Sequence, residues 1–219
     1  IFIHVNGNDH ICIVQMDDLR APLHILQLFA DRRIFVAKRI VACDGAADIC
    51  YRRLGRRPEV AIGDLDSLKS VKSALTVVKV DDQETNDLRK AIDFCAERGW
   101  KDPVVVGAFG KREDHSIGNV FLALDHEVEI IADHGRFVPV RGRLSLTLPP
   151  GTPVSIFAPD PETRMRSKGL KWPLDGVRFS GLYRATLNRT DRRRVCIESD
   201  RRALVYLAFA GRPHPEGSR

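Results

Sequence analysis

The stretch from Val104 to Ile131 reads VVVGAFGKREDHSIGNVFLALDHEVEII and shows the pattern that organises the first part of the chain. It opens with a β-branched run and a glycine-containing turn, and it closes with a second apolar run, Val128–Ile131. Between them, residues 114–124 carry apolar side chains at helical spacing, namely Ile117, Val120, Phe121 and Leu124. A strand, a helix and a strand in this order predict a parallel βαβ unit.

The same alternation extends toward the N-terminus. Short apolar runs predict further buried strands at Ile34–Ala37, Arg39–Cys43, Val60–Ile62 and Thr76–Val80. A second helix is predicted over Asp87–Arg98, with Asn86 as its N-cap and Gly99 at its C-terminal end. We therefore expect an α/β N-terminal domain built on a mainly parallel sheet.

The pattern changes after Pro139. Leu144–Leu148 alternates apolar and polar residues, and a turn at Pro149–Pro153 separates it from a strand-like run, Val154–Ala158. No useful segment of helical periodicity follows, so we expect a small all-β, sandwich-like C-terminal domain. These patterns place the two domains at residues 1–138 and 139–219.

The composition is that of a soluble globular protein, because 43% of the 219 residues are hydrophobic and 29% are charged. The longest apolar run, Ala203–Ala210, is too short to cross a bilayer, and the segment after Ile1 lacks the pattern of a signal peptide. Five cysteines without CxxC spacing argue against a disulfide framework and against a Cys-rich zinc site. We expect reduced thiols, a cytoplasmic location and no membrane partner.

The net charge of +6 arises entirely in the C-terminal part. From Gly151 onward there are 14 Lys and Arg against 7 Asp and Glu, whereas the first 150 residues carry 21 against 22. The densest groups, Arg192–Arg194 and Arg201–Arg202, flank apolar runs, which favours solvated turn residues at strand ends. Recruitment of an anionic ligand and nucleic-acid binding are the alternatives. Nucleic-acid binding is disfavoured because no aromatic stacking platform accompanies the charge.

Four aspartates follow predicted strands. Asp44 follows the run ending at Cys43, Asp64 and Asp66 lie in the motif GDLDS, and Asp87 opens a helix after the next strand. Ligands of parallel α/β sheets bind at the carboxyl ends of the strands, and carboxylates gathered there repel one another unless a hard cation is bound. Each aspartate alone could be a turn or helix-start residue. Together they predict a Mg²⁺ site for a phosphate-bearing substrate.

A glycine-containing turn, Gly107–Asn119, follows the strand at Val104–Val106 and leads into a helix. Gly107 and Gly110 allow close backbone approach, and the free N–H groups of a helix start attract anions. Lys111 and Arg112 add positive charge suited to phosphate. The turn is not a Walker A loop, because GxxxxGK[ST] is absent.

These motifs together resemble the thiamine pyrophosphokinase (thiamine diphosphokinase) family. The similarity covers nearly the whole chain and is carried by Ala42–Ala47, Gly63–Ser67, Asp82–Leu88, Gly107–Asn119 and, more weakly, Gly169–Leu174. The resemblance implies an α/β catalytic domain that binds ATP and Mg²⁺, a thiamine-binding β domain, and a homodimer with thiamine near the interface. The implied reaction transfers pyrophosphate from ATP to the hydroxyl of thiamine and releases AMP.

The resemblance also implies the site residues. Asp64, Asp66, Asp87 and Arg112 would be catalytic, and the metal ligands would be Asp44, Asp64, Asp66 and Asp87. The remaining ligand-binding residues would be Ser67, Gln83, Asn86, Gly107, Gly110, Lys111, Asp114, His115, Asn119 and Trp172. Gln83 would lie near thiamine, while Arg112, Asp114, His115 and Asn119 would hold or orient ATP. Trp172 and Tyr183 are candidate walls for the thiazolium ring, with β-domain core packing as the alternative for each.

The chain departs from the family pattern at a few positions. Asn86 stands where the family often has Thr, and Ala185–Asn188 stands where the family often has a Ser-Asn pair. Neither change removes a carboxylate. Two other functions remain open: a Mg²⁺-dependent nucleotide phosphohydrolase, which would use water as the acceptor, and a basic nucleic-acid-binding protein.

Overall fold

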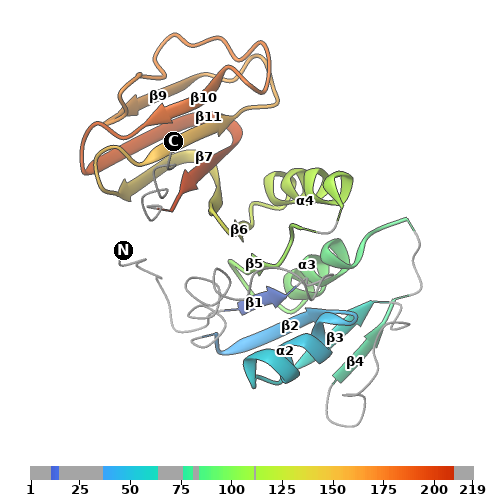
Figure 1. The fold of residues 1–219 in the computed structure, drawn as a ribbon. Helices are drawn as coiled ribbons and strands as arrows, with labels where there is room; N and C mark the ends of the chain where they lie inside the picture. Colours follow the sequence, from blue (N-terminus) through green and yellow to red (C-terminus); the bar gives the residue numbers. More distant parts are fainter. Residues whose placement is uncertain (1–10, 15–36, 64–75, 81–83, 111, 210–219) are drawn as a thin grey trace, which may run out of the picture. The chain divides into compact units, whose positions relative to one another are not determined.

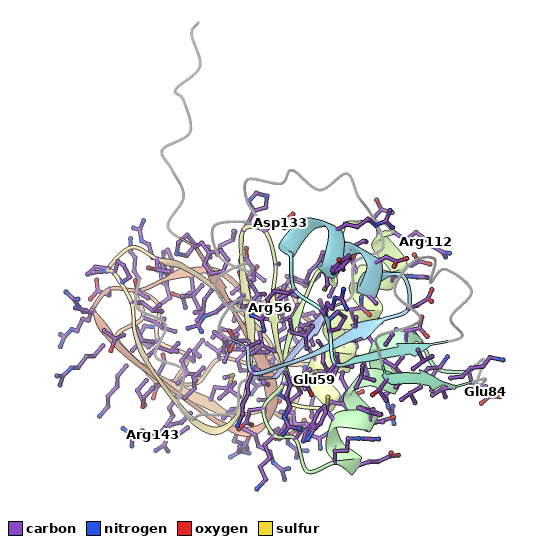
Figure 2. All side chains as sticks on the ribbon, turned by 90° about the horizontal axis from the view of Figure 1, so that it is seen from below. Arg56, Glu59, Glu84, Arg112, Asp133 and Arg143 are labelled. Carbon is purple, nitrogen blue, oxygen red and sulfur yellow. The ribbon has the colours of Figure 1, made fainter. Side chains whose placement is uncertain are left out.

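The computed structural model describes residues 11–14, 37–63, 76–80, 84–110 and 112–209 (Figure 1). The chain divides into two compact units. The N-terminal unit spans residues 2–133 and the C-terminal unit spans residues 134–219. Asp133, labelled in Figure 2, is the last residue of the first unit. Within the described residues, no helix is long and apolar enough to cross a membrane.

The N-terminal unit contains a parallel sheet with strand order β6-β5-β1-β2-β3-β4. All five strand pairs are parallel, which confirms the α/β prediction. The strands are β1 (Ile11–Val14), β2 (Arg39–Cys43), β3 (Val60–Gly63), β4 (Thr76–Lys79), β5 (Val104–Val106) and β6 (Glu129–Ile131). The chain steps outward from β1 to β4 and then returns to β5 on the other side of β1. Such a reversal of strand order opens a ligand-binding crevice at the carboxyl edge of the sheet.

Burial along these strands explains why their sequences are continuously apolar. Every residue of β3 is buried, as are four of the five residues of β2. Strands covered on both faces lose the alternation that marks a half-exposed sheet. By contrast, β4 lies at the edge of the sheet and is mostly exposed.

Three described helices belong to this unit: α2 (Ala46–Leu54), α3 (Asp87–Glu97) and α4 (Glu113–Asp125). The predicted ends of α3 are confirmed. The Asn86 side chain accepts a hydrogen bond from the backbone N–H of Arg89 at 2.9 Å, and Gly99 follows the helix with a positive φ of 67°. These contacts satisfy backbone groups that a helix end leaves unpaired.

Helix α4 forms where the sequence predicts it, but part of its predicted apolar face is exposed. Ile117 is 59% exposed and Phe121 is 42% exposed, whereas the polar Asn119 is buried. The side that packs inward carries Asn119, Ala123 and Leu124. The apolar periodicity therefore predicted the wrong buried face for this helix. The side that carries Asn119 faces the protein, where the Asn119 side chain makes a buried hydrogen bond.

The C-terminal unit is an antiparallel β structure, as predicted. Its strands are β7 (Gly135–Thr147), β8 (Pro153–Phe157), β9 (Met165–Lys168), β10 (Ala185–Arg189) and β11 (Arg194–Ala208). The long β11 pairs with β7 along its length, with β9 in its first half and with β8 in its second half. A register break between Ser199 and Ala203 separates the two halves of β11.

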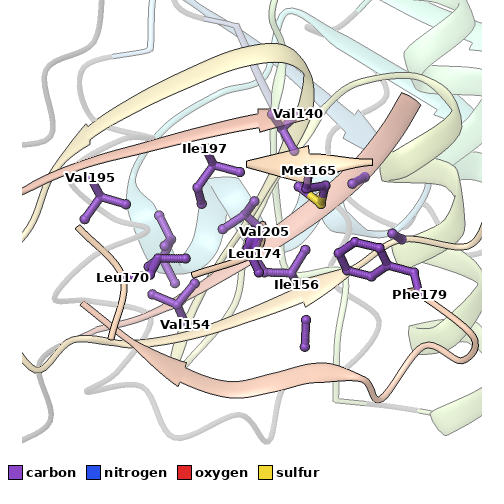
Figure 3. Close-up of a cluster of buried hydrophobic side chains, with 14 of the residues drawn as sticks. Val140, Val154, Ile156, Met165, Leu170, Leu174, Phe179, Val195, Ile197 and Val205 are labelled. Carbon is purple, nitrogen blue, oxygen red and sulfur yellow. The ribbon is translucent and has the colours of Figure 1, made fainter. Parts of the chain in front are cut away.

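Side chains from both halves of β11 share one buried cluster, which forms the core of this unit (Figure 3). Ile197 comes from the first half and Val205 from the second, and they lie in the same cluster as Ile156 of β8 and Met165 of β9. Loop residues Leu174 and Phe179 complete the cluster. Burial of these apolar side chains is the main stabilising contribution available to a β domain of this size.

Candidate active site

Asp44, which follows β2, and Asp87, which opens α3, lie on either side of Gly63, the last residue of β3. Asp44 directly follows β2, and its backbone N–H donates a hydrogen bond to the Ile62 carbonyl at 2.8 Å. Asp87 is the first residue of α3, and its carbonyl accepts a hydrogen bond from the Cys43 thiol at 3.5 Å. The end of β2 is thereby linked to the start of α3.

Gly63 lies between the two carboxylate side chains. A Cβ added at this position would lie 3.1 Å from the Asp44 Cβ and 3.2 Å from both Cγ and Oδ1 of Asp87. The φ of Gly63 is +149°, a conformation that residues with a side chain rarely adopt. The glycine of the GDLDS motif therefore leaves room for two carboxylates that come from different elements.

The oxygens of this site fit a hard cation such as Mg²⁺. Oδ1 of Asp44 is buried and has no hydrogen-bond partner within the described residues. A buried carboxylate oxygen without a partner is costly, and a bound cation would remove that cost. Carboxylate oxygens are also the ligands that Mg²⁺ prefers in proteins. Asp44 and Asp87 are two of the four predicted metal ligands.

The other two predicted ligands, Asp64 and Asp66, lie outside the described residues. The same holds for Ser67, Gln83 and Lys111. Among the side chains that are described, no group of three or more His, Cys, Asp or Glu lies close enough together to hold a metal ion.

Lys90 is a charged residue of the site that the sequence analysis missed. Its ammonium Nζ lies 3.3 Å from Oδ1 of Asp87, and its side chain is only 6% exposed. It occurs one helical turn after Asp87, on the side of α3 that also buries Leu88 and Ala91. The signal for this contact was present in the sequence. Lys90 follows Asp87 by three residues on an apolar helix face, which is the spacing at which two side chains of a helix meet.

The predicted phosphate turn is held by a buried amide. Gly107 and Gly110 have positive φ values of 71° and 110°, which lets this short loop fold back before α4 begins. The Asn119 side chain donates a hydrogen bond to the Ala108 carbonyl at 2.8 Å, and its Oδ1 accepts one from Asn86 at 3.4 Å. Asn86 and Asn119 thus connect the start of α3 to the glycine turn.

Arg112 and Asp114 form an exposed, two-point ion pair at the start of α4. Nε and Nη2 of Arg112, which is labelled in Figure 2, donate to the two carboxylate oxygens of Asp114 at 3.0 and 2.6 Å. These hydrogen bonds lower the pKa of the Asp114 carboxyl and raise the pKa of the Arg112 guanidinium. His115 is exposed, and its backbone N–H donates to Asp114 Oδ1 at 2.9 Å.

In the C-terminal unit, Trp172 is exposed rather than part of the core. Its backbone N–H donates to Asn188 Oδ1 at 3.3 Å, and Asn188 Nδ2 donates to its carbonyl at 2.7 Å. Two cations, Lys171 and Arg189, lie 4.9 and 5.7 Å from the centre of the indole ring. Tyr183 is 75% exposed, so the core-packing alternative is wrong for both aromatic residues.

Comparison with family models matches both units. The model described as thiamin pyrophosphokinase, catalytic domain, matches residues 31–132, and the model of its substrate-binding domain matches residues 135–206. The chain belongs to the thiamin pyrophosphokinase family. Family membership makes it an ATP-dependent transferase that forms thiamine diphosphate, with thiamin pyrophosphokinase activity (EC 2.7.6.2).

Solved structures with thiamin pyrophosphokinase in their titles share the fold of this family member. The protein from Geobacillus thermodenitrificans has a TM-score of 0.73 at 23% identity, covering 93% of this chain and 98% of that one. The Bacillus subtilis protein has a TM-score of 0.71 at 19% identity, with coverages of 91% and 98%. The Candida albicans protein has a TM-score of 0.66 at 14% identity, with coverages of 92% and 89%. A comparison with curated protein sequences found no match.

Proposed function

We propose that the carboxyl edge of the parallel sheet transfers the β,γ-pyrophosphoryl unit of ATP to the primary hydroxyl of thiamine. The observation that supports this proposal most directly is the convergence of Asp44 and Asp87 around Gly63. The hydroxyl oxygen forms a bond to the β-phosphorus, and the bond from this phosphorus to the α,β-bridging oxygen breaks. AMP leaves with that oxygen, and a strand-end carboxylate accepts the hydroxyl proton.

Mg²⁺ is the proposed metal, held by carboxylates of Asp44, Asp64, Asp66 and Asp87. When bound, this ion neutralises charge on the phosphate oxygens of ATP. For Asp44 and Asp87, the sheet and α3 fix the backbone from which each carboxylate would reach the ion. Because the protein does little covalent chemistry in such a transfer, placement of the two substrates is its main contribution.

The glycine turn and the start of α4 are proposed to hold the ATP phosphates. Backbone N–H groups at a helix start attract anions, and a guanidinium can grip phosphate through two hydrogen bonds. Arg112 already makes such a two-point contact with Asp114. We propose that Asp114 holds the guanidinium ready for phosphate, while Asn86 and Asn119 keep the turn in place. His115, exposed one residue after Asp114, would contact ATP directly.

Thiamine is proposed to bind against Trp172 of the C-terminal unit. Trp172 is exposed, and the Asn188 side chain binds both its backbone N–H and its backbone carbonyl. Because Lys171 and Arg189 already lie near the ring, a further cation there would be repelled. We therefore place the neutral pyrimidine ring of thiamine, rather than its thiazolium, against Trp172.

A homodimer and a cytoplasmic location complete the proposal. Large apolar side chains of the C-terminal unit are exposed, among them Trp172, Leu182 and Tyr183. Exposed apolar side chains of this size favour burial against a partner. Sedimentation should then give twice the monomer mass of 24.6 kDa. Within the described residues, Cys50, Cys95 and Cys196 form no disulfide, which suits a reducing compartment.

The test is a time course with purified protein, ATP, Mg²⁺ and thiamine, following AMP and thiamine diphosphate together by liquid chromatography. Equimolar formation of both products, dependent on Mg²⁺ and on thiamine, is the expected result. ADP or free phosphate formed without thiamine would instead indicate the phosphohydrolase. Salt-sensitive retention of DNA or RNA without any turnover would indicate the nucleic-acid-binding protein.

A further inference from the structure

Lys90 is a buried cation of the N-terminal unit that the proposed reaction does not yet use. Its side chain is 6% exposed, and Asp87 is the only acidic side chain that it contacts within the described residues. The distance from Nζ to Asp87 Oδ1 is 3.3 Å. An ammonium has three N–H donors, so one contact among the described residues leaves most of the cost of removing it from water without compensation.

Neither the helix nor the core explains a lysine at this position. Lys90 lies in the first turns of α3, where the helix dipole disfavours positive charge. Its buried neighbours on α3 include Leu88, Ala91 and Ile92, and an apolar side chain would pack among them without a desolvation cost. Replacing a whole buried ion pair by apolar residues of similar volume is often neutral or stabilising, so the Lys90–Asp87 pair is not needed for packing alone.

The position of Asp87 supplies the missing reason. Its carboxylate lies beside Gly63 and Asp44, at the edge where the metal and the phosphates are proposed to bind. The contact with Lys90 fixes one of its oxygens from the protein side. The Asp87 side chain is 30% exposed, so it is not fully enclosed by the protein.

We propose that Lys90 is a positioning residue, whose ammonium orients the Asp87 carboxylate toward the metal. It also offsets part of the negative charge of the strand-end aspartates before metal and nucleotide bind. This inference rests on the proposed function, since it assigns Asp87 to the metal. Groups that orient metal ligands typically change metal affinity or activity by about 10- to 100-fold when they are removed.

The experiment compares Lys90→Met with the wild type in a binding measurement that involves no turnover. Mn²⁺ is titrated in the presence of α,β-methylene-ATP, whose P–C–P linkage cannot be cleaved, and free Mn²⁺ is followed by electron paramagnetic resonance. We expect the Mn²⁺ concentration at half-saturation to rise about 10- to 100-fold in Lys90→Met. The melting temperature without metal is measured in parallel and should fall only modestly, because the Asp87 carboxylate left unpaired is 30% exposed to solvent.

Two further variants make the test specific. Lys90→Arg keeps the positive charge and should restore Mn²⁺ binding to within a few-fold of the wild type. Lys101→Met removes an exposed lysine of the same unit and should leave binding unchanged. If Lys90→Met does not fold, Lys90→Gln, which keeps a donor without the charge, replaces it in the same titration.

The outcomes separate this inference from the proposed function. Wild-type protein that binds no Mn²⁺–nucleotide complex would overturn the metal site, and the role of Lys90 with it. Wild-type protein that binds the complex, with Lys90→Met or Lys90→Gln binding it equally well, would overturn the role of Lys90 alone. Weaker binding in the neutral variants, restored by Lys90→Arg, would support it.

Discussion

Asp44 carries two local costs at one residue. Its φ of +42° lies in the left-handed region, and its buried Oδ1 lacks a hydrogen-bond partner within the described residues. Asp and Asn tolerate this backbone conformation better than most residues. Costs of this kind persist where the surrounding structure enforces them, and they are common at functional sites.

We therefore expect Asp44→Asn to fold normally and to lose activity. The amide keeps the backbone preference but is a poor ligand for Mg²⁺, so thiamine diphosphate formation should fall about 10²- to 10⁴-fold. Asp64→Asn and Asp66→Asn should behave in the same way. Asp102→Asn is the matched control, because Asp102 also has a positive φ but is exposed in a loop. Near-normal turnover in the Asp44, Asp64 and Asp66 variants would argue against the metal assignment.

The buried thiols of the N-terminal unit give a prediction about pH. Burial raises the pKa of Cys50 and of Cys95 from 9.0 to about 12, and nearby Arg56 and Arg98 offset this only in part. The folded protein thus keeps these protons to higher pH than the unfolded chain. Their contribution to the free energy of unfolding should be complete below pH 9 and should decrease as the pH rises toward 12.

Alkylation measures the same property residue by residue. At pH 8, iodoacetamide should modify the partly exposed Cys196 before Cys50 and Cys95, as read by peptide mass spectrometry. Urea unfolding at several alkaline pH values gives the second readout. Equal labelling rates for the three thiols would contradict the burial described here.

At the scale of elements, Asn119 connects three segments: α4, the glycine turn and the N-cap of α3. Asn119→Ala leaves the Ala108 carbonyl and the Asn86 amide without this partner. We expect the free energy of unfolding to fall by about 1–3 kcal/mol, measured by urea denaturation of the whole chain. Ser116→Ala on the same helix removes a more exposed side-chain bond to the Arg112 carbonyl and should cost less than about 0.5 kcal/mol. Similar losses in the two variants would show that Asn119 has no special bridging role.

Strand β10 contains an unusual backbone position at Leu187. This residue has a φ of +64° and is 87% exposed, next to the register shift that precedes Asn188. A left-handed conformation costs about 1–2 kcal/mol for a residue with a side chain. Leu187→Gly should thus raise the free energy of unfolding by about 0.5–1 kcal/mol after the entropic cost of glycine.

The control for Leu187 is Ser145→Gly, at an exposed position in regular strand β7. It should lower the free energy of unfolding by about 0.5–1 kcal/mol, because glycine weakens a strand interior. Urea denaturation of both variants provides the comparison. A loss of stability in both would show that the backbone at Leu187 stores no strain.

Elements with strong periodicity could be predicted from sequence, and elements set by tertiary contacts could not. The strands at Arg39–Cys43 and Val104–Val106 match their predicted ranges, because β-branched runs buried on both faces are distinctive. Helix α2 was not predicted, since it starts at Gly45 without a capping side chain. Strand β9, Met165–Lys168, has only one apolar residue and forms through its pairing with β11.

The candidate site shows the same division. Aspartates that follow parallel strands must lie at one edge of the sheet, so the proximity of Asp44 and Asp87 was open to prediction. The ion pair of Lys90 depends on which side of α3 is buried, and the contact of Asn119 depends on how α4 is rotated. The partner of a polar side chain on a helix cannot be predicted from its residue type alone.

For the whole molecule, the acidic and basic residues are concentrated in different parts of the chain. The acidic strand-end residues lie in the N-terminal unit, whereas the net positive charge comes from the part of the chain after Gly151. In the C-terminal unit, Arg201 pairs with Asp160 at 2.8 Å and Arg143 pairs loosely with Glu198 at 3.7 Å. Surface pairs of this kind contribute little to stability.

The proposed metal would also stabilise the folded chain, because Oδ1 of Asp44 has no hydrogen-bond partner within the described residues. A cation that binds only the native chain removes a penalty that the unfolded chain never had, and it thereby draws the folding equilibrium toward the native state. At a concentration about 100 times its dissociation constant, Mg²⁺ should add about 2.7 kcal/mol to the free energy of unfolding. Calorimetry should show a melting temperature that rises with Mg²⁺ in the wild type and stays constant in Asp44→Asn. The concentration of free Mg²⁺ in its surroundings would then help to set how long each molecule of this protein survives.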